Sequence, residues 1–278
     1  MAVSIADVVG GVTIRPPKIV LYGVGGVGKT TFASRAPNPI FIFAEEGQGT
    51  LDVQRFKFGQ EEVIHSWEDL LDAVGALYHQ EHDYQTLVID SLDAAESFLW
   101  AYTAKKHNKT DIESFDYNKG YYYAAEFTSV LLQGLDALRR VRNMSIVIIC
   151  HSQIVRFEAP DAPSYDRYDL RLQKRLTPVI DHWADAVLFA NYRHSIVSED
   201  ETFGRERMRA VGYGERVLYC EARPAFRAKN RYGLPPELPL EWSAFQSSIV
   251  TTGKPNTEQL ESTQQPEKTD KEQERAKI

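Results

Sequence analysis

The sequence predicts an α/β fold in which helices flank a mostly parallel central sheet. Three observations lead to this prediction. Short, nearly continuous apolar runs alternate with longer helical patterns, as in sheets that are covered on both faces. A glycine-rich segment directly follows the first apolar run and opens a helical stretch. Beyond Tyr192 the pattern becomes alternating and glycine-punctuated, which is typical of antiparallel strands and hairpins appended to such a sheet.

The apolar runs and the patterns between them define the expected elements in chain order. Strands are expected at residues 18–22, 40–43, 86–89, 146–150 and 186–189. Helices are expected at residues 30–35, 67–79, 92–106 and 121–142. Ser66 precedes the second helix and is a residue type that caps helix N-termini. The regular alternation of strand and helix favours parallel pairing of the strands.

The composition is that of a soluble globular protein, with 43% hydrophobic and 26% charged residues. No apolar run approaches the roughly 18–20 residues that a membrane helix needs, and the start of the chain lacks the regions of a signal peptide. Cys150 and Cys220 have neither zinc nor redox spacing. We expect a cytoplasmic protein with no membrane partner.

Composition also predicts the domain organisation. Residues 251–278 are rich in Thr, Gln, Glu and Lys and hold almost no large apolar residue, so they cannot offset the entropy of ordering. We therefore expect a disordered polar tail at 251–278, one domain at 18–250 and an N-terminal extension at 1–17.

Charge is distributed unevenly along a chain whose net charge is −7. Residues 201–235 contain four acidic and eight basic residues, the latter being Arg205, Arg207, Arg209, Arg216, Arg223, Arg227, Lys229 and Arg231. Such segregation can build an anion-binding face on an acidic protein. Alternatively, these basic side chains are solvent-exposed charges on hairpins and bind no anion.

The strongest motif is Gly-Val-Gly-Gly-Val-Gly-Lys-Thr at residues 23–30, which satisfies GxxxxGK[ST]. Its glycines let backbone N–H groups wrap phosphates at the start of a helix. Lys29 would reach the β- and γ-phosphates, and the Thr30 hydroxyl would bind Mg²⁺. The residues expected to bind ATP here are Gly23, Gly25, Gly26, Val27, Gly28, Lys29, Thr30 and Thr31.

Polar side chains at the ends of three other strands complete a predicted catalytic site. Asp90 ends the 86–89 strand and would direct Mg²⁺ through water. Glu45 and Glu46 follow the 40–43 strand, where a carboxylate could act as general base, and Glu45 is the first choice. His151 follows the 146–150 strand and could sense the γ-phosphate, with a structural role as the alternative.

These motifs, in this order, resemble the core of the RecA superfamily across roughly residues 15–240. The stretch from Ile40 through AEEGQGTLD is similar to that family's strand ending in the catalytic glutamate, and His151 stands where the family carries a nucleotide-sensing Gln. Residues 227–231, RAKNR, resemble its Lys-Asn-Lys strand. The resemblance implies that Lys229 and Arg231 reach the ATP site of a neighbouring subunit. Segments 16–30 and 228–235 are most similar to small phage-encoded RecA-like proteins of single-strand annealing and recombination.

Two segments interleave cations with aromatic rings, an arrangement that suits single-stranded DNA because phosphates meet charge while bases stack. One follows Asp90 and includes Lys109, Tyr117 and residues 121–123; the other follows His151 and includes Tyr165 and Arg171. In RecA-like proteins the corresponding loops line the DNA channel, and helix faces with core tyrosines are the alternative. The residues expected to contact DNA are Lys105, Lys106, Lys119, Arg156, Phe157, Arg167, Tyr168 and Arg171.

The resemblance implies a Mg²⁺-dependent, DNA-stimulated ATPase that binds single-stranded DNA and promotes annealing or homologous recombination. It also implies a homo-oligomer, ring or filament, with its active site at the subunit interface, in the host cytoplasm if phage-encoded. A single-strand binding protein is a further candidate partner. Two other functions stay open: a nucleotide-dependent switch or loader that acts on protein partners, and a small-molecule kinase, which Glu45 disfavours.

Overall fold

The computed structural model describes residues 15–47, 49–159, 163–193, 195–201, 205–211 and 214–252, together with residues 4, 5, 8 and 10. Most of the predicted N-terminal extension and residues 253–278 of the predicted tail lie outside this part of the chain. The predicted domain boundaries therefore stay predictions, although the last helix continues to Thr252.

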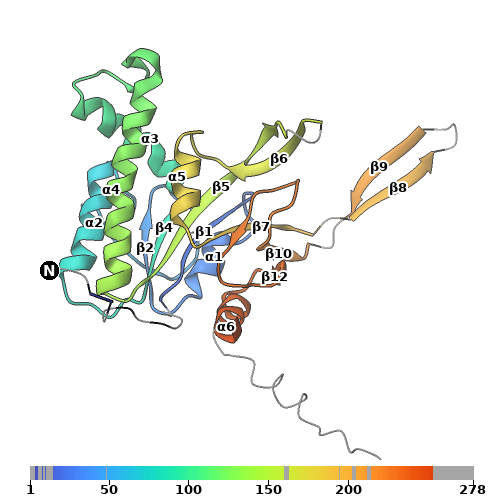
Figure 1. Cartoon of the computed structure of the whole chain (residues 1–278), viewed down its shortest axis with the longest axis horizontal. Helices are drawn as coiled ribbons and strands as arrows, with labels where there is room; N and C mark the ends of the chain where they lie inside the picture. The colour runs from blue at the N-terminus through green and yellow to red at the C-terminus, as the bar shows by residue number, and fades with distance from the viewer. Residues whose placement is uncertain are drawn as a thin grey trace, which may run out of the picture.

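The middle layer of the fold is a ten-stranded sheet (Figure 1). Its parallel centre consists of β1 (Lys18–Gly23), β2 (Pro39–Phe43), β4 (Thr86–Asp90), β5 (Ser145–Phe157) and β7 (Ala186–Tyr192). Around it lie β3 (Gln54–Arg55), β6 (Tyr165–Leu170), β10 (Arg216–Tyr219), β11 (Lys229–Asn230) and β12 (Glu237–Pro239). The strand order is β12-β10-β7-β1-β5-β4-β2-β3, with β11 on β7 and β6 on β5. β8 (Ser195–Glu201) and β9 (Arg205–Val211) form a separate antiparallel pair.

Helices cover both faces of this sheet. One face is covered by α2 (Trp67–His79), α3 (Leu92–Lys106), α4 (Lys119–Val141) and α5 (Leu176–Trp183), and the other by α1 (Lys29–Ser34) and α6 (Trp242–Thr252). Short 3-10 turns at Ile112–Ser114 and Asp116–Asn118 lie between α3 and α4. The predicted fold class is confirmed: a mostly parallel sheet flanked by helices, with antiparallel strands toward the C-terminal part.

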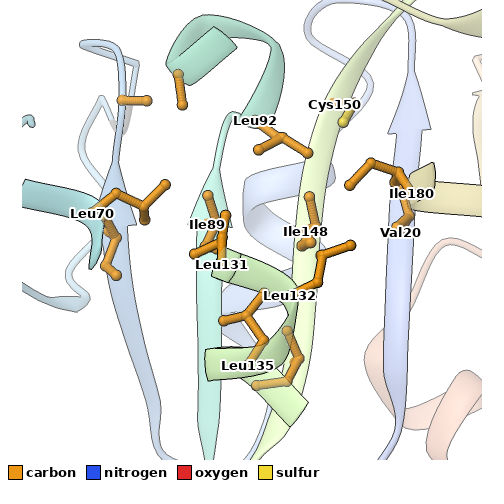
Figure 2. Close-up of a cluster of buried hydrophobic side chains, with 14 of the residues drawn as sticks. Val20, Leu70, Ile89, Leu92, Leu131, Leu132, Leu135, Ile148, Cys150 and Ile180 are labelled. Carbon is orange, nitrogen blue, oxygen red and sulfur yellow. The ribbon is translucent and has the colours of Figure 1, made fainter. Parts of the chain in front are cut away.

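The apolar strands form because their side chains alternate between two buried layers. In β1, Ile19 and Leu21 face α1 and α6, whereas Val20 and Tyr22 face the layer of α4 and α5. Figure 2 shows this second layer, in which Leu131, Leu132 and Leu135 of α4 lie over β4 and β5. Every side chain of β4 is buried, so its carboxyl end is held rigidly at the sheet edge.

Helix α2 confirms the predicted cap. The Ser66 hydroxyl accepts from the backbone N–H of Asp69 at 3.1 Å, and the Asp69 carboxylate accepts from the backbone N–H of Ser66 at 3.0 Å. This reciprocal arrangement satisfies two backbone donors that the first turn cannot pair internally. Among the described helices, none is long and apolar enough to cross a membrane.

Helices α5 and α6 and the second half of β5 are not among the elements expected from the sequence. Helix α5 holds Pro178 within its first turn, where proline is tolerated although it lowers the helical signal. Helix α6 forms because Trp242 and Phe245 pack on Phe32 of α1, with ring centroids 5.3 and 5.9 Å away. β5 does not end at residue 150 but continues to Phe157, since its second half leaves the parallel sheet and pairs with β6.

Candidate active site

The segment between β1 and α1 has the strand–turn–helix setting that a phosphate-binding loop requires. Gly26 and Gly28 have φ angles of 72° and 105°, in the left-handed region that favours glycine. Gly23 is needed for a different reason, because a Cβ there would lie 2.1 Å from the carbonyl oxygen of Ala190 on β7. Val27 is fully buried and anchors the loop to the core.

Lys29 and Thr30, which open α1, meet Asp90 at the end of β4. Lys29 Nζ donates to the carbonyl oxygens of Gly23 and Val24, both at 3.1 Å, and burial lowers the pKa of this amine. Thr30 Oγ1 donates to Asp90 Oδ2 at 2.7 Å. Burial raises the pKa of Asp90, against the opposing hydrogen bond from Thr30 and the charge of Lys29. The hydroxyl and carboxylate oxygens of this pair are the hard donors that Mg²⁺ prefers, so the residues fit that ion.

The predicted catalytic side chains converge on one pocket of about 490 Å³ beside the glycine-rich loop. It is lined by Lys29, Thr30, Glu45, Glu46, Asp90 and His151, among others. These residues come from α1, from the turn after β2, from the end of β4 and from the middle of β5, where that strand leaves the parallel sheet.

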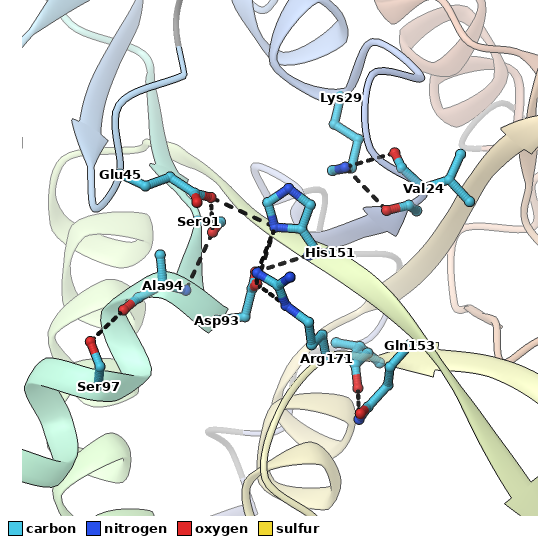
Figure 3. Close-up of polar contacts among 12 residues, drawn as sticks. Val24, Lys29, Glu45, Ser91, Asp93, Ala94, Ser97, His151, Gln153 and Arg171 are labelled. Atoms are coloured by element: carbon cyan, nitrogen blue, oxygen red, sulfur yellow. Dashed lines mark hydrogen bonds and ion pairs between the residues drawn. The ribbon is translucent and has the colours of Figure 1, made fainter.

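Glu45 and Glu46 differ in how they are held. Glu45 Oε1 accepts a hydrogen bond from Ser91 Oγ at 2.6 Å and lies 3.6 Å from His151 Nδ1 (Figure 3). Glu46 lines the same pocket, but its side chain is exposed and no described residue binds its carboxylate. A general base needs a fixed position, so the geometry favours Glu45.

His151 is bound by an acidic residue that the sequence analysis does not identify. The side chain of Asp93, in the first turn of α3, is fully buried; its Oδ1 accepts from the backbone N–H of His151 at 2.9 Å, and its Oδ2 lies 3.1 Å from His151 Nδ1. Arg171 Nη2 approaches the same Oδ2 at 2.6 Å. Burial alone would raise the pKa of Asp93, but hydrogen bonds from His151 and the charge of Arg171 outweigh it and hold this pKa at about 2. The position of Asp93, one turn beyond Asp90, is the sequence signal that could have indicated it.

A second buried carboxyl, Glu96, lies one turn further along α3. It accepts a hydrogen bond from the backbone N–H of Gln173 at 2.9 Å, and burial raises its pKa to about 7. Asp93 and Glu96 together bind the segment that follows β6. The contact chain of Glu45, His151, Asp93 and Arg171 therefore runs from the pocket to the base of the β5–β6 hairpin.

Lys229 and Arg231 lie at the opposite edge of the sheet from the glycine-rich loop. Lys229 on β11 is the register partner of Val187 near the start of β7, whereas Gly23 pairs with Ala190 further along that strand. Lys229 Nζ donates to the carbonyl oxygens of Asp181 and His182 at the end of α5. Arg231 is 3.6 Å from Asp185, beside the start of β1. Neither side chain reaches the pocket of its own chain.

The first predicted DNA segment forms the end of the α3–α4 helix pair, which extends beyond the sheet (Figure 1). Lys105 Nζ donates to Glu68 at 3.1 Å, and Lys106 lies 5.0 Å from the centre of the Tyr102 ring. Lys119 is exposed at the start of α4. Tyr117 and Tyr122 are 91% and 56% exposed, so two rings and two cations, those of Lys106 and Lys119, face solvent there.

The second predicted DNA segment is a hairpin rather than a loop, and most of its named side chains contact other parts of the chain. Arg167 lies 3.9 Å from the Phe157 ring centre and donates to Asp169 at 3.0 Å. Tyr168 stacks on Phe189 of the core, with centroids 5.1 Å apart, and Arg171 is bound to Asp93. These contacts pair each arginine with a carboxylate, although Asp169 is shared with Arg227, and they occupy one face of the Tyr168 ring. Arg156 is exposed and donates to Ser164 at 2.7 Å.

In the basic stretch at 201–235, Arg223 and Arg227 are among the described arginines that form ion pairs. Arg223 pairs with Glu237 at 2.8 Å, and Arg227 pairs with Asp169 at 2.8 Å. The side chains of Arg205, Arg207 and Arg209 lie outside the described residues.

The chain is similar in sequence to a protein family and to one curated protein. The family model for an AAA domain matches residues 15–232 of the chain. The SPbeta prophage-derived uncharacterized protein YorG of Bacillus subtilis (strain 168) is 25% identical over 175 residues, which cover 62% of this chain and 49% of YorG. The chain thus spans about half the length of this curated relative. The crystal structure of the RadB recombinase aligns with a TM-score of 0.41 at 12% identity, over 74% of this chain and 80% of that chain.

Proposed function

The chain belongs to the AAA-domain family, and from that premise we propose that it is a Mg²⁺-dependent RecA-like ATPase that binds single-stranded DNA and promotes annealing or recombination. The observation that carries the ATPase part is the meeting of Lys29, Thr30, Asp90 and Glu45 in one pocket beside the glycine-rich loop. The prophage origin of YorG supports a phage-encoded protein.

In this proposal each polar group has a defined task. Lys29 exchanges its two carbonyl partners for phosphate oxygens, and the Thr30–Asp90 pair holds Mg²⁺, with Asp90 acting through water. The metal ion supplies charge that offsets the negative charge of the phosphates. Glu45, fixed by Ser91, orients and deprotonates the attacking water. His151, between Glu45 and Asp93, transmits the state of the pocket toward the β5–β6 hairpin.

Substitution of the base separates binding from chemistry. Glu45→Gln keeps the shape and the acceptor for Ser91 but cannot take a proton, so ATP should still bind while turnover falls by about 10²-fold or more. Glu46→Gln is the matched control, because it changes the neighbouring carboxylate in the same pocket. Lys29→Ala should abolish ATP binding. Normal turnover in Glu45→Gln together with loss in Glu46→Gln would assign the base to Glu46.

The DNA part of the proposal rests on the end of the α3–α4 pair, where Lys106, Lys119, Tyr117 and Tyr122 are exposed and accessible to a single strand. Two lysines that neutralise two phosphates would contribute a log–log salt slope of about −1.4 to single-strand affinity. Replacing both lysines with Ala should flatten the slope by about that amount.

Two controls separate charge from stacking at this surface. Tyr122→Ala should weaken binding with little change in slope, because stacking releases no counterions. Lys105→Ala should change little, because Glu68 already binds that amine. Single-strand affinity that is independent of salt, measured with a non-hydrolysable ATP analogue, would contradict the DNA proposal.

The ion-paired arginines of the β5–β6 hairpin favour one alternative function. Arg167 and Arg171 are bound to Asp169 and Asp93, so this hairpin offers less free positive charge than its sequence suggests. A nucleotide-dependent switch that acts on a protein partner through the hairpin would retain the same ATP chemistry. Absence of single-strand binding in all nucleotide states would favour this alternative.

Assembly completes the proposal. Lys229 and Arg231 cannot serve their own pocket, because they lie at the other edge of the sheet. We assign them to the nucleotide of a neighbouring chain, where a basic side chain stabilises developing phosphate charge as an arginine finger does.

A further inference from the structure

The two strand ends from which the β8–β9 pair departs both contact the glycine-rich loop. β7 ends at Tyr192 and β10 begins at Arg216, and these residues are register partners in the antiparallel pair. Tyr192 Oη donates to the carbonyl oxygen of Gly26 at 3.3 Å. Arg216 Nη1 lies 3.0 Å from the place where a Cβ on Gly28 would stand. The guanidinium of Arg216 therefore packs directly on the loop residue that precedes Lys29.

Arg216 also differs from its neighbours in charge balance. Arg193, which follows Tyr192, lies 3.0 Å from Glu215 and 2.9 Å from Glu237, and Arg223 lies 2.8 Å from Glu237. Arg216 is exposed, and among the residues whose side chains the structure describes, no carboxylate lies within ion-pair distance of it. Glu215 and Glu237, the described acidic residues at this edge, pair with Arg193 and Arg223 instead.

A guanidinium in this position is suited to a phosphate chain. It is permanently charged and offers a planar set of N–H donors that matches phosphate oxygens in a bidentate manner. A Cβ at position 28 would stand 3.0 Å from Arg216 Nη1, so the end of this exposed side chain lies close against the loop and would have to shift by a few tenths of an ångström. Glycine at position 28 is required by its φ angle of 105°.

We propose that Arg216 is a second phosphate-binding cation, acting with Lys29 on the nucleotide held by the glycine-rich loop of the same chain. This inference rests on the proposed ATP binding and adds a residue to it. Arg216 is the first residue of β10, which follows the β8–β9 pair in the chain. Binding of a nucleotide to Arg216 would therefore also affect the position of this strand end.

The test is equilibrium binding of a fluorescent ATP analogue and of its ADP counterpart with Mg²⁺, at a protein concentration low enough to keep the chain monomeric. Loss of one charge-assisted contact should weaken the affinity of Arg216→Ala by about 10- to 100-fold for both nucleotides. Arg216→Lys keeps the charge but loses the planar set of donors, so its affinity should be intermediate. Arg223→Ala is the matched control, because Glu237 already binds that exposed arginine.

The outcomes separate the proposed role of Arg216 from the proposed ATP binding on which it rests. Wild-type affinity in Arg216→Ala and Arg216→Lys, with binding lost in Lys29→Ala, would refute the role of Arg216 and leave the ATP site intact. An affinity loss that appears only at concentrations where the chain assembles would place Arg216 at a neighbour's nucleotide and refute its role in the same chain. No nucleotide binding by the wild type would refute the proposed function itself.

Discussion

Replacing Glu96 should stabilise the protein at neutral and alkaline pH. Glu96 on α3 is 7% exposed, and burial raises its pKa from the ordinary 4.5 to about 7. The folded chain therefore keeps this carboxyl protonated at pH values where the unfolded chain has already ionised it. A carboxyl with a raised folded pKa favours the native state fully below pH 4.5, and this benefit is lost as the pH rises from 4.5 to about 7.

The size of this effect follows from the pKa difference. The gap between 4.5 and about 7, at about 1.4 kcal/mol for each pH unit, comes to about 3 kcal/mol of unfolding free energy lost by pH 8. Glu96→Gln cannot ionise and retains an oxygen to accept from the Gln173 backbone N–H. The variant should match the wild type near pH 4.5 and exceed its stability by up to about 3 kcal/mol at pH 8.

Urea unfolding followed by circular dichroism, at a series of pH values from 4.5 to 8, measures this difference. Glu126→Gln, on an exposed position of α4, is the matched control and should show no difference that grows with pH. A Glu96→Gln variant that is destabilised by the same amount at every pH would refute the reasoning, because it would mean that the carboxyl acts through packing alone.

Three further predictions concern other parts of the structure. Asp93→Asn should cost about 2 kcal/mol of unfolding free energy at pH 7, because the lowered pKa of Asp93 stabilises the folded chain at pH values above about 4 and this stabilisation is lost as the pH falls from about 4 to 2. The variant should lack this acid sensitivity, and equal urea midpoints of variant and wild type at pH 7 would contradict the prediction. Mixing Lys29→Ala with Arg231→Ala should restore part of the ATPase activity, and a mixture as inactive as its components, with assembly intact, would exclude action across subunits. Phe245→Ala, which removes a fully buried ring from Phe32, should cost about 3–5 kcal/mol in denaturant unfolding, whereas a loss below about 1 kcal/mol would mean that α6 is not part of the core.

Much of the central sheet and of the helices beside it can be predicted from sequence, because each of these elements is specified by residues close together in the chain. The limits of α2 and α3 match the expectation, since Ser66 and Ser91 cap amphipathic or apolar stretches that follow directly. The glycine-rich loop and Asp90 are likewise fixed by their position after buried strands. Each of these features is specified by residues close together in the chain.

The missed features depend on contacts between distant segments. Asp93 and Glu96 are ordinary helical acids in the sequence, and only the return of residues 171–173 over α3 makes them buried partners. Arg171 has the charge expected of a DNA contact, but the path of residues 171–173 over α3 brings it into an ion pair with Asp93. Helix α6 has its hydrophobic partner in α1, more than two hundred residues earlier, so its own sequence gives a weak signal.

The rate of ATP hydrolysis by the full chain, measured with Mg²⁺ in the presence and absence of poly(dT) at low salt, tests most directly whether this pocket is a DNA-responsive ATPase. Hydrolysis should rise when poly(dT) is added, the rise should fade with increasing salt, and Glu45→Gln should abolish turnover under both conditions. Hydrolysis that depends on Glu45 but ignores poly(dT) would contradict the DNA role. A wild-type chain that hydrolyses no ATP under either condition would contradict the proposed enzyme altogether.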